Sequence, residues 1–221
     1  MSGYLNIHAH ATHSWTAETI YSYDIHEQLP DHPPNTLFSC GLHPWHLTDD
    51  NCEDSIKELE KLISSSQMVM IGECGFDRIK GPSIATQIHA FEAQTRLARQ
   101  HALPMILHCV KAFDLLLAYK KKHRHPLPLI IHGFRGKPLL ARQLSDKGFY
   151  LSVGPQILQD RKAAYALLSS LDRPFFIETD NQTLPIEELY HEIAILLNLE
   201  VEQLKDRIFA AWKLIGLLKN E

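Results

Sequence analysis

Short apolar segments recur along the chain, and most of them are followed by a segment with helical periodicity. Eight such segments are candidate strands, at residues 4–8, 18–23, 36–42, 68–72, 104–108, 127–132, 149–153 and 174–178. Most are apolar at consecutive positions, which is typical of parallel strands buried on both faces. The pattern therefore predicts a mainly parallel sheet.

The segments between these strands carry apolar residues at the spacing of one helix face. Helices are predicted at residues 54–63, 83–101, 113–122, 139–147, 161–171, 185–197 and 201–218. Ser83 is a good N-cap for the second of them, and Gly148 directly follows the fourth. The connections at residues 9–17 and 24–35 are too short or too rich in proline for full helices.

Strands alternating with helices predict a parallel α/β fold, and eight strands favour a closed (β/α)8 TIM-type barrel. An open doubly wound sheet would also fit the alternation. The 221 residues lie within the range of about 200 to 400 that such barrels need. We therefore expect one domain over residues 1–221, a barrel whose first two βα connections are shortened.

Composition excludes several classes of protein. Apolar residues make up 45% of the chain and charged residues 22%, which excludes a disordered or fibrous chain. No apolar run approaches the roughly 18 residues that span a bilayer. The four cysteines form no CxxC pair, which predicts reduced thiols and a cytoplasmic protein. The net charge of −4 provides no general attraction to nucleic acid, so binding of nucleic acid must be local.

Metal-ligand residue types stand at the carboxyl ends of the predicted strands, where a barrel places its active site. These residues are His8, His10, Glu73, His108, His132 and Asp180. A single buried histidine is more often a hydrogen-bonded core residue than a ligand. Six such residues at the ends of five predicted strands are hard to explain in that way.

Four imidazoles and two carboxylates suit Zn²⁺, Mn²⁺ or Fe, and Mg²⁺ less well. No cysteine is among them, which indicates a catalytic rather than a structural site. His8 and His10 point to the same side of an extended strand, so both can bind one ion. Six ligands are too many for one open catalytic ion, and they suit two divalent ions about 3.5–4 Å apart that share a carboxylate.

The chain resembles the TatD-type metal-dependent deoxyribonucleases, within the amidohydrolase-like TIM barrels. The motifs that carry the resemblance are HAH (8–10), GLHP (41–44), GECGFD (72–77), ILH (106–108), HGFRG (132–136), YLSVG (150–154) and ETD (178–180). The resemblance implies a TatD-like deoxyribonuclease or phosphodiesterase with DNA as its substrate, single-stranded or at 3′ ends, or another phosphodiester.

The same resemblance implies the roles of the ligands. His8, His10 and Asp180 would hold one metal ion, and Glu73 would bridge to a second ion. His108 and His132 would hold that second ion. Asp180 would also be the base that deprotonates the attacking water.

The chain departs from the family pattern at four positions near or behind the expected rim. Asn6 stands where an aspartate is usual, Val110 where an arginine is usual, Gln182 where a proline is common, and Trp212 where an asparagine is common. The metal ligands themselves are complete.

Four further residues are candidate substrate contacts. Arg78, Lys111 and Arg135 follow strands at the rim and could hold phosphate. The alternative for each is an ordinary solvated loop charge. His43 in GLHP is expected to donate a hydrogen bond to substrate rather than to be a seventh ligand.

Two other functions remain open. One is a metal-dependent amidohydrolase or esterase that acts on a small molecule, for which Glu73 would serve equally well. The contexts GECGFD and HGFRG favour the phosphodiesterase. The other is a binding or scaffold protein with a relic site, against which the complete ligand set argues because unpaired buried carboxylates cost stability.

Overall fold

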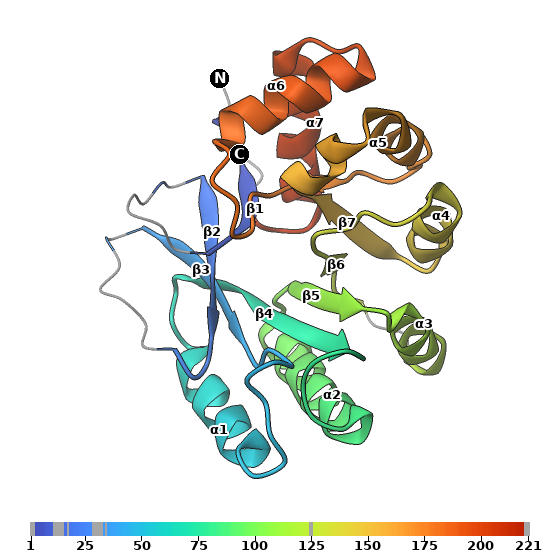
Figure 1. Cartoon of the computed structure of the whole chain (residues 1–221). Helices are drawn as coiled ribbons and strands as arrows, with labels where there is room; N and C mark the ends of the chain where they lie inside the picture. Colours follow the sequence, from blue (N-terminus) through green and yellow to red (C-terminus); the bar gives the residue numbers. More distant parts are fainter. Residues whose placement is uncertain are drawn as a thin grey trace.

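The computed structural model describes residues 3–10, 16, 18–27, 33, 35–123 and 126–218. Within them, eight parallel strands form one sheet in the order β1 to β8, so that each strand pairs with the next along the chain (Figure 1). The strands are β1 Asn6–Ala9, β2 Thr19–Asp24, β3 Leu37–Gly41, β4 Met68–Asp77, β5 Met105–Val110, β6 Leu129–Ile131, β7 Phe149–Val153 and β8 Phe176–Ile177.

The two edge strands meet, which closes the sheet. Ala9 forms a parallel bridge with Asp180, just beyond β8. The Asp180 N–H donates to the His8 carbonyl at 3.0 Å, and the His10 N–H donates to the Asp180 carbonyl at 3.0 Å. The closure confirms the predicted barrel and excludes the open doubly wound sheet.

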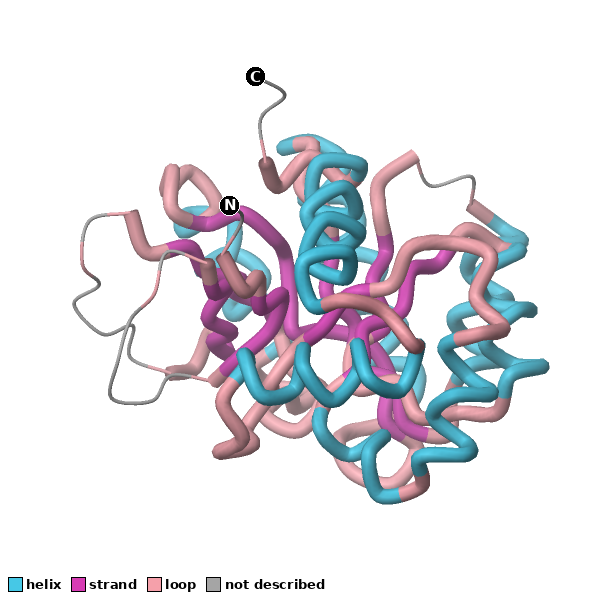
Figure 2. Tube along the Cα trace, turned by 90° about the horizontal axis from the view of Figure 1, so that it is seen from above, coloured by secondary structure: helices cyan, strands magenta, loops and turns pink. Residues whose placement is uncertain are grey.

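Helices cover the outside of the barrel (Figure 2). They are α1 Cys52–Leu62, α2 Ile84–His101, α3 Phe113–Lys122, α4 Pro138–Asp146, α5 Arg161–Leu168, α6 Ile186–Leu197 and α7 Val201–Leu214, with a short 3-10 helix, η1 Pro155–Gln159. The predicted helices are confirmed, although the fifth and last end earlier than expected. The two connections predicted to be shortened lie largely outside the described residues.

The core lies between the strands and the helices. On one side of the barrel, Phe91 of α2 packs on Phe76 of β4, with ring centroids 4.8 Å apart. On the other side, Trp212 of α7 is 1% exposed and lies in a cluster with Tyr190 of α6. Trp212 therefore acts as a core residue at the position where the family resemblance suggests an asparagine.

Strand β4 is longer than predicted and continues from Gly72 to Asp77. The register between β4 and β5 shifts between Ile71 and Cys74, and the strand then pairs regularly up to Asp77 with Val110. A register shift of this kind re-aims side chains relative to a regular strand. Glu73 lies within this irregular stretch, inside the strand rather than after it.

None of the helices in the described part of the chain is long and apolar enough to cross a membrane.

Candidate metal centre

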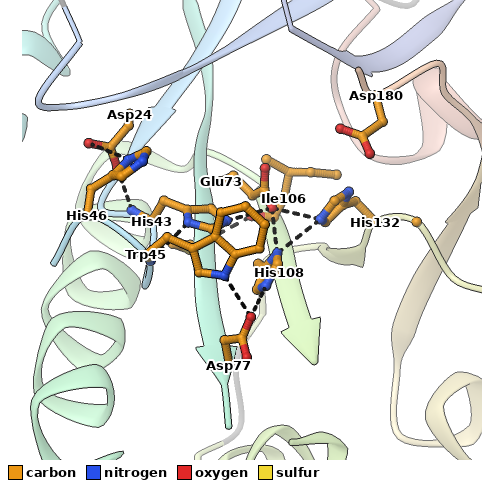
Figure 3. A network of polar contacts seen from close by, with 12 residues as sticks. Asp24, His43, Trp45, His46, Glu73, Asp77, Ile106, His108, His132 and Asp180 are labelled. Atoms are coloured by element: carbon orange, nitrogen blue, oxygen red, sulfur yellow. Dashed lines mark hydrogen bonds and ion pairs between the residues drawn. The ribbon is translucent and has the colours of Figure 1, made fainter. Parts of the chain in front are cut away.

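All six predicted ligands converge at the carboxyl mouth of the barrel. Figure 3 shows four of them, Glu73, His108, His132 and Asp180. They come from both ends of the chain and from its middle. His8 and His10 come from β1 and its end, Glu73 from β4, His108 from β5, His132 from just after β6 and Asp180 from just after β8.

The first ligand cluster joins His8, His10 and Asp180 to one oxygen of Glu73. His8 Nε2 lies 3.4 Å from Glu73 Oε2 and 3.7 Å from Asp180 Oδ1. His10 Nε2 lies 3.6 Å and 3.5 Å from the same two atoms. Two atoms bound to one ion at about 2.1 Å with a tetrahedral angle lie about 3.4 Å apart. The spacing of the cluster therefore fits a cation held between the ligands.

His8 provides an independent test of this fit. Its side chain is fully buried, and neither ring nitrogen has a hydrogen-bond partner within the described residues. A buried imidazole without partners costs free energy unless something else satisfies it. Its Nε2 faces two carboxylates at 3.4 and 3.7 Å without a hydrogen bond to either, which is the environment of a metal ligand.

The second cluster gathers three histidines around the other oxygen of Glu73. Glu73 Oε1 lies 2.7 Å from His108 Nδ1, 2.7 Å from His132 Nε2 and 3.1 Å from His43 Nε2. Glu73 thus faces the first cluster with Oε2 and the second with Oε1. Glu73 is therefore shared between the two clusters.

His43 differs from the other histidines in its hydrogen bonding. Its Nδ1 accepts a hydrogen bond from the Trp45 backbone N–H at 3.1 Å. In the neutral ring the hydrogen then resides on Nε2, which donates to Glu73. Burial lowers the pKa of His43, although Glu73 opposes this, so the neutral ring is favoured. His43 also lies close enough to Glu73 and His108 to form a ligand group with them, but in the hydrogen bonding seen here it is a donor to Glu73.

Two carboxylates behind the ligands were not predicted. Asp77 Oδ2 lies 3.1 Å from His108 Nε2, and Glu178 Oε1 lies 3.4 Å from His132 Nδ1. A carboxylate on the far nitrogen of a metal-binding histidine fixes its tautomer and orientation. Both residues are buried. Asp77 ends the GECGFD motif and Glu178 begins the ETD motif, and these motifs were the only sequence signal for them.

Other contacts hold these two carboxylates in their charged form. Burial opposes ionisation of Asp77, but the Trp45 indole and the backbone N–H of Ile79 help to hold its pKa at about 2. Glu178 accepts hydrogen bonds from the Gly133 N–H at 2.7 Å and from the Ser152 hydroxyl.

Charges within the centre are strongly coupled. Burial alone would raise the pKa of Glu73, but the imidazoles around it, His132 foremost, hold it well below its usual range. Burial alone would lower the pKa of His132, but Glu73 and Glu178 raise it well above its usual value. The carboxylate of Glu73, which favours the protonated form of His132, is the same charge that a bound cation would neutralise.

The predicted phosphate contacts fall into two groups. Lys111 and Arg135 line a cavity of about 460 Å³ that also reaches His108, His132 and Asp180. Arg78 is instead held by both oxygens of Asp114, at 2.6 and 2.7 Å, and donates to the Lys111 carbonyl at 3.0 Å.

Asn6 has a structural role at the barrel seam. Its Nδ2 donates to Thr179 Oγ1 at 2.8 Å, and its Oδ1 accepts from the Thr179 N–H at 3.1 Å. These two bonds join β1 to the segment that carries Asp180. An asparagine supplies both the donor and the acceptor that this pairing uses, which an aspartate could not do.

A family model described as TatD related DNase matches residues 6–206. The chain belongs to the TatD family. The curated TatD relatives include the 3′-5′ ssDNA/RNA exonuclease TatD of Cronobacter sakazakii, which is 33% identical over 64% of this chain and 59% of its own length. A metal-dependent hydrolase of Haemophilus influenzae is 28% identical over 70% of this chain and 62% of its own length.

Solved structures of TatD proteins share the fold. The YjjV protein of Escherichia coli, a TatD homologue, superposes with a TM-score of 0.69 at 19% identity and covers 83% of this chain and 77% of its own. A TatD-family hydrolase of Entamoeba histolytica superposes with a TM-score of 0.67 at 16% identity, over 82% and 75%. This TatD-family chain spans about 60% of the length of its first curated relatives.

Proposed function

We propose that this TatD-family protein is a metal-dependent phosphodiesterase that removes nucleotides from the ends of single-stranded nucleic acid, with two divalent ions, Zn²⁺, Mn²⁺ or Mg²⁺. The observation that carries the proposal is the four-ligand cluster around Glu73 Oε2, whose spacing fits a bound cation. Relatives named as exonucleases of single-stranded DNA and RNA support the choice of substrate.

In this proposal His8, His10 and Asp180 hold one ion, His108 and His132 hold the second, and Glu73 joins them. Bound divalent cations lower the pKa of water and offset charge on phosphate oxygens. Asp180 accepts the proton of the attacking water, because it is the more exposed of the two carboxylates, at 20% of its side chain against 7% for Glu73.

The remaining contacts concern the substrate. We propose that Lys111 and Arg135 hold phosphates of the strand in the cavity they line. His43 can donate its Nε2 hydrogen to substrate only when Glu73, which accepts it here, releases it. Arg78 acts on this cavity indirectly. It donates a hydrogen bond to the Lys111 carbonyl and so positions Lys111, while its own charge is paired with Asp114.

The test is a panel of substrates with protein reconstituted in each metal. Single-stranded DNA, duplex DNA, RNA and bis-p-nitrophenyl phosphate are compared with a carboxylic ester and an amide. We expect hydrolysis of phosphodiesters, loss of activity in excess chelator, and recovery when metal returns. Full activity in chelator with no metal by elemental analysis would refute the proposal, and turnover of the ester or amide alone would make the protein a small-molecule hydrolase.

A matched variant controls for unspecific effects of histidine loss. His89→Ala removes an exposed histidine that pairs with Glu53 on the outside of the barrel. Its metal content and activity should equal those of the wild type, whereas His8→Ala should lose both.

A further inference from the structure

Trp45 is a large aromatic residue left half exposed at the mouth of the metal centre. The residue is 44% exposed and follows the GLHP motif directly. Together with His43, Glu73 and His108 it lines a cavity of about 280 Å³ that opens onto the ligands. Figure 3 shows its indole in front of His43 and His108. An exposed tryptophan beside a reaction centre is a candidate contact for a flat, apolar part of the substrate.

The indole is held rigidly. Its Nε1 donates to Asp77 Oδ2 at 2.7 Å. Its ring stands edge-on to the rings of His43 and His108, with centroids 5.0 and 5.6 Å away. A side chain fixed in this way loses little conformational entropy when a ligand stacks on it.

Lys80 lies over the Trp45 ring. Its Nζ lies 3.8 Å from the centroid of the Trp45 ring. Among the described residues, the wall of the 280 Å³ cavity includes Trp45 but not Lys80. The cation thus covers part of the indole, while 44% of Trp45 stays exposed at the cavity.

Charge distinguishes the two cavities that meet at the metal centre. Both cavities reach the metal ligands His108, His132 and Asp180. Beyond the ligands, the one with Trp45 carries the carboxylates of Asp24 and Glu27, while the other carries Lys111 and Arg135. Phosphates of the strand other than the one at the metal ligands are attracted to Lys111 and Arg135 in the second cavity and repelled by Asp24 and Glu27 in the first. The part of the substrate that enters the Trp45 cavity should therefore be the one without further phosphates.

We propose that Trp45 is the stacking platform for the base of the terminal nucleotide, with the strand extending toward Lys111 and Arg135. This inference rests on the proposed function, since it assigns a subsite of the same centre. Stacking of one base on an aromatic side chain changes affinity about 5- to 100-fold and tolerates any base. The subsite would thus favour a terminal nucleotide that carries a base, with little preference among bases.

The experiment compares two single-stranded oligonucleotides that differ only at the terminal nucleotide, which carries a base in one and is abasic in the other. Wild type, Trp45→Phe and Trp45→Leu are assayed with metal at saturation. Both substitutions remove the indole N–H that Asp77 accepts, and only phenylalanine keeps an aromatic face. The difference between the two variants therefore isolates stacking from any effect through Asp77.

We expect wild type to show a KM about 5- to 100-fold lower for the base-bearing end, Trp45→Phe to keep most of this preference, and Trp45→Leu to lose it. Equal loss in both variants, on both oligonucleotides, would overturn the stacking role and make Trp45 a positioning residue for Asp77. A wild type that cleaves both ends with equal KM would overturn the subsite alone. A wild type that cleaves neither would overturn the proposed function together with it.

Discussion

Replacing Asp77 by asparagine tests how the second ion depends on a residue that does not bind it. The Asp77 carboxylate makes four contacts through its two oxygens. Oδ1 accepts from the backbone N–H groups of Ile79 and Lys80, at 2.7 and 3.0 Å. Oδ2 accepts from the Trp45 indole at 2.7 Å and lies 3.1 Å from His108 Nε2. Asparagine keeps the shape but has one oxygen and one NH₂ group.

Either orientation of the asparagine has a cost. If the NH₂ group faces Ile79 and Lys80, two backbone donors lose their acceptor, at about 1–3 kcal/mol each. If it faces His108, Nε2 must accept, the ring hydrogen moves to Nδ1, and the lone pair directed at the cation site is lost. Loss of such an outer partner typically lowers metal affinity about 10- to 100-fold, which corresponds to about 1.4–2.8 kcal/mol.

We therefore expect Asp77→Asn to bind the ion at His108 about 10- to 100-fold more weakly, while the ion at His8 and His10 stays bound. High metal should restore most of the rate. Metal content in metal-buffered solutions and melting temperature with and without metal measure the effect. Asp114→Asn, which neutralises an exposed carboxylate nearby, is the control and should change neither the metal affinity nor the gain in melting temperature on adding metal. Wild-type affinity for both ions and an unchanged melting temperature in Asp77→Asn would refute the reasoning.

Three further predictions follow from the same site. Asp180→Asn should keep at least one ion but lose about 10²–10⁴-fold in turnover. His108→Ala should lose an ion, and excess metal should partly restore its rate. If excess metal restored the rate of Asp180→Asn but not that of His108→Ala, the roles of base and ligand would be reversed. Cleavage should favour single-stranded or frayed ends and depend weakly on salt, because the net charge is −4; a steep log–log slope would contradict this. Burial opposes the charged form of His132, yet Glu73 and Glu178 raise its pKa well above 6.5 in the metal-free protein. Protonation therefore stabilises that protein below pH about 6.5, and the stabilisation is lost as the pH rises through the raised pKa. Metal needs the deprotonated ring, so the melting-temperature gain on adding metal should grow with pH, and a constant gain would contradict this.

The elements that could be predicted are those with local signals. β7 and α3 begin and end at the predicted residues, because each is a continuous apolar or amphipathic segment between clear breaks. The six candidate ligands could be placed together because a barrel brings strand ends to one rim, so that residue type and position together predict a site. His43 was expected to contact substrate rather than a metal ion, but residue type could not show that its Nε2 hydrogen goes to Glu73, since its tautomer depends on the Trp45 backbone N–H.

Features that depend on tertiary geometry could not be predicted. The apolar run of β4 ends at Gly72, so the sequence shows no reason for pairing to continue to Asp77. That continuation is what brings Asp77 beneath His108. The approach of Trp45 to His108 likewise joins the loop after β3 to β5, and no periodicity encodes a contact of this kind.

The seam between β1 and β8 links metal binding to the completion of the chain. His8 and His10 are made early in synthesis, but Asp180 and Thr179 follow about 170 residues later. A nascent chain therefore carries half of an ion-binding site until the last strand is in place. An ion bound there fastens the two ends of the sheet to each other, in addition to the backbone bonds at Ala9. Loop closure over such a long stretch is entropically costly, so a cation bound to these residues would favour the closed barrel over one whose edge strands have separated.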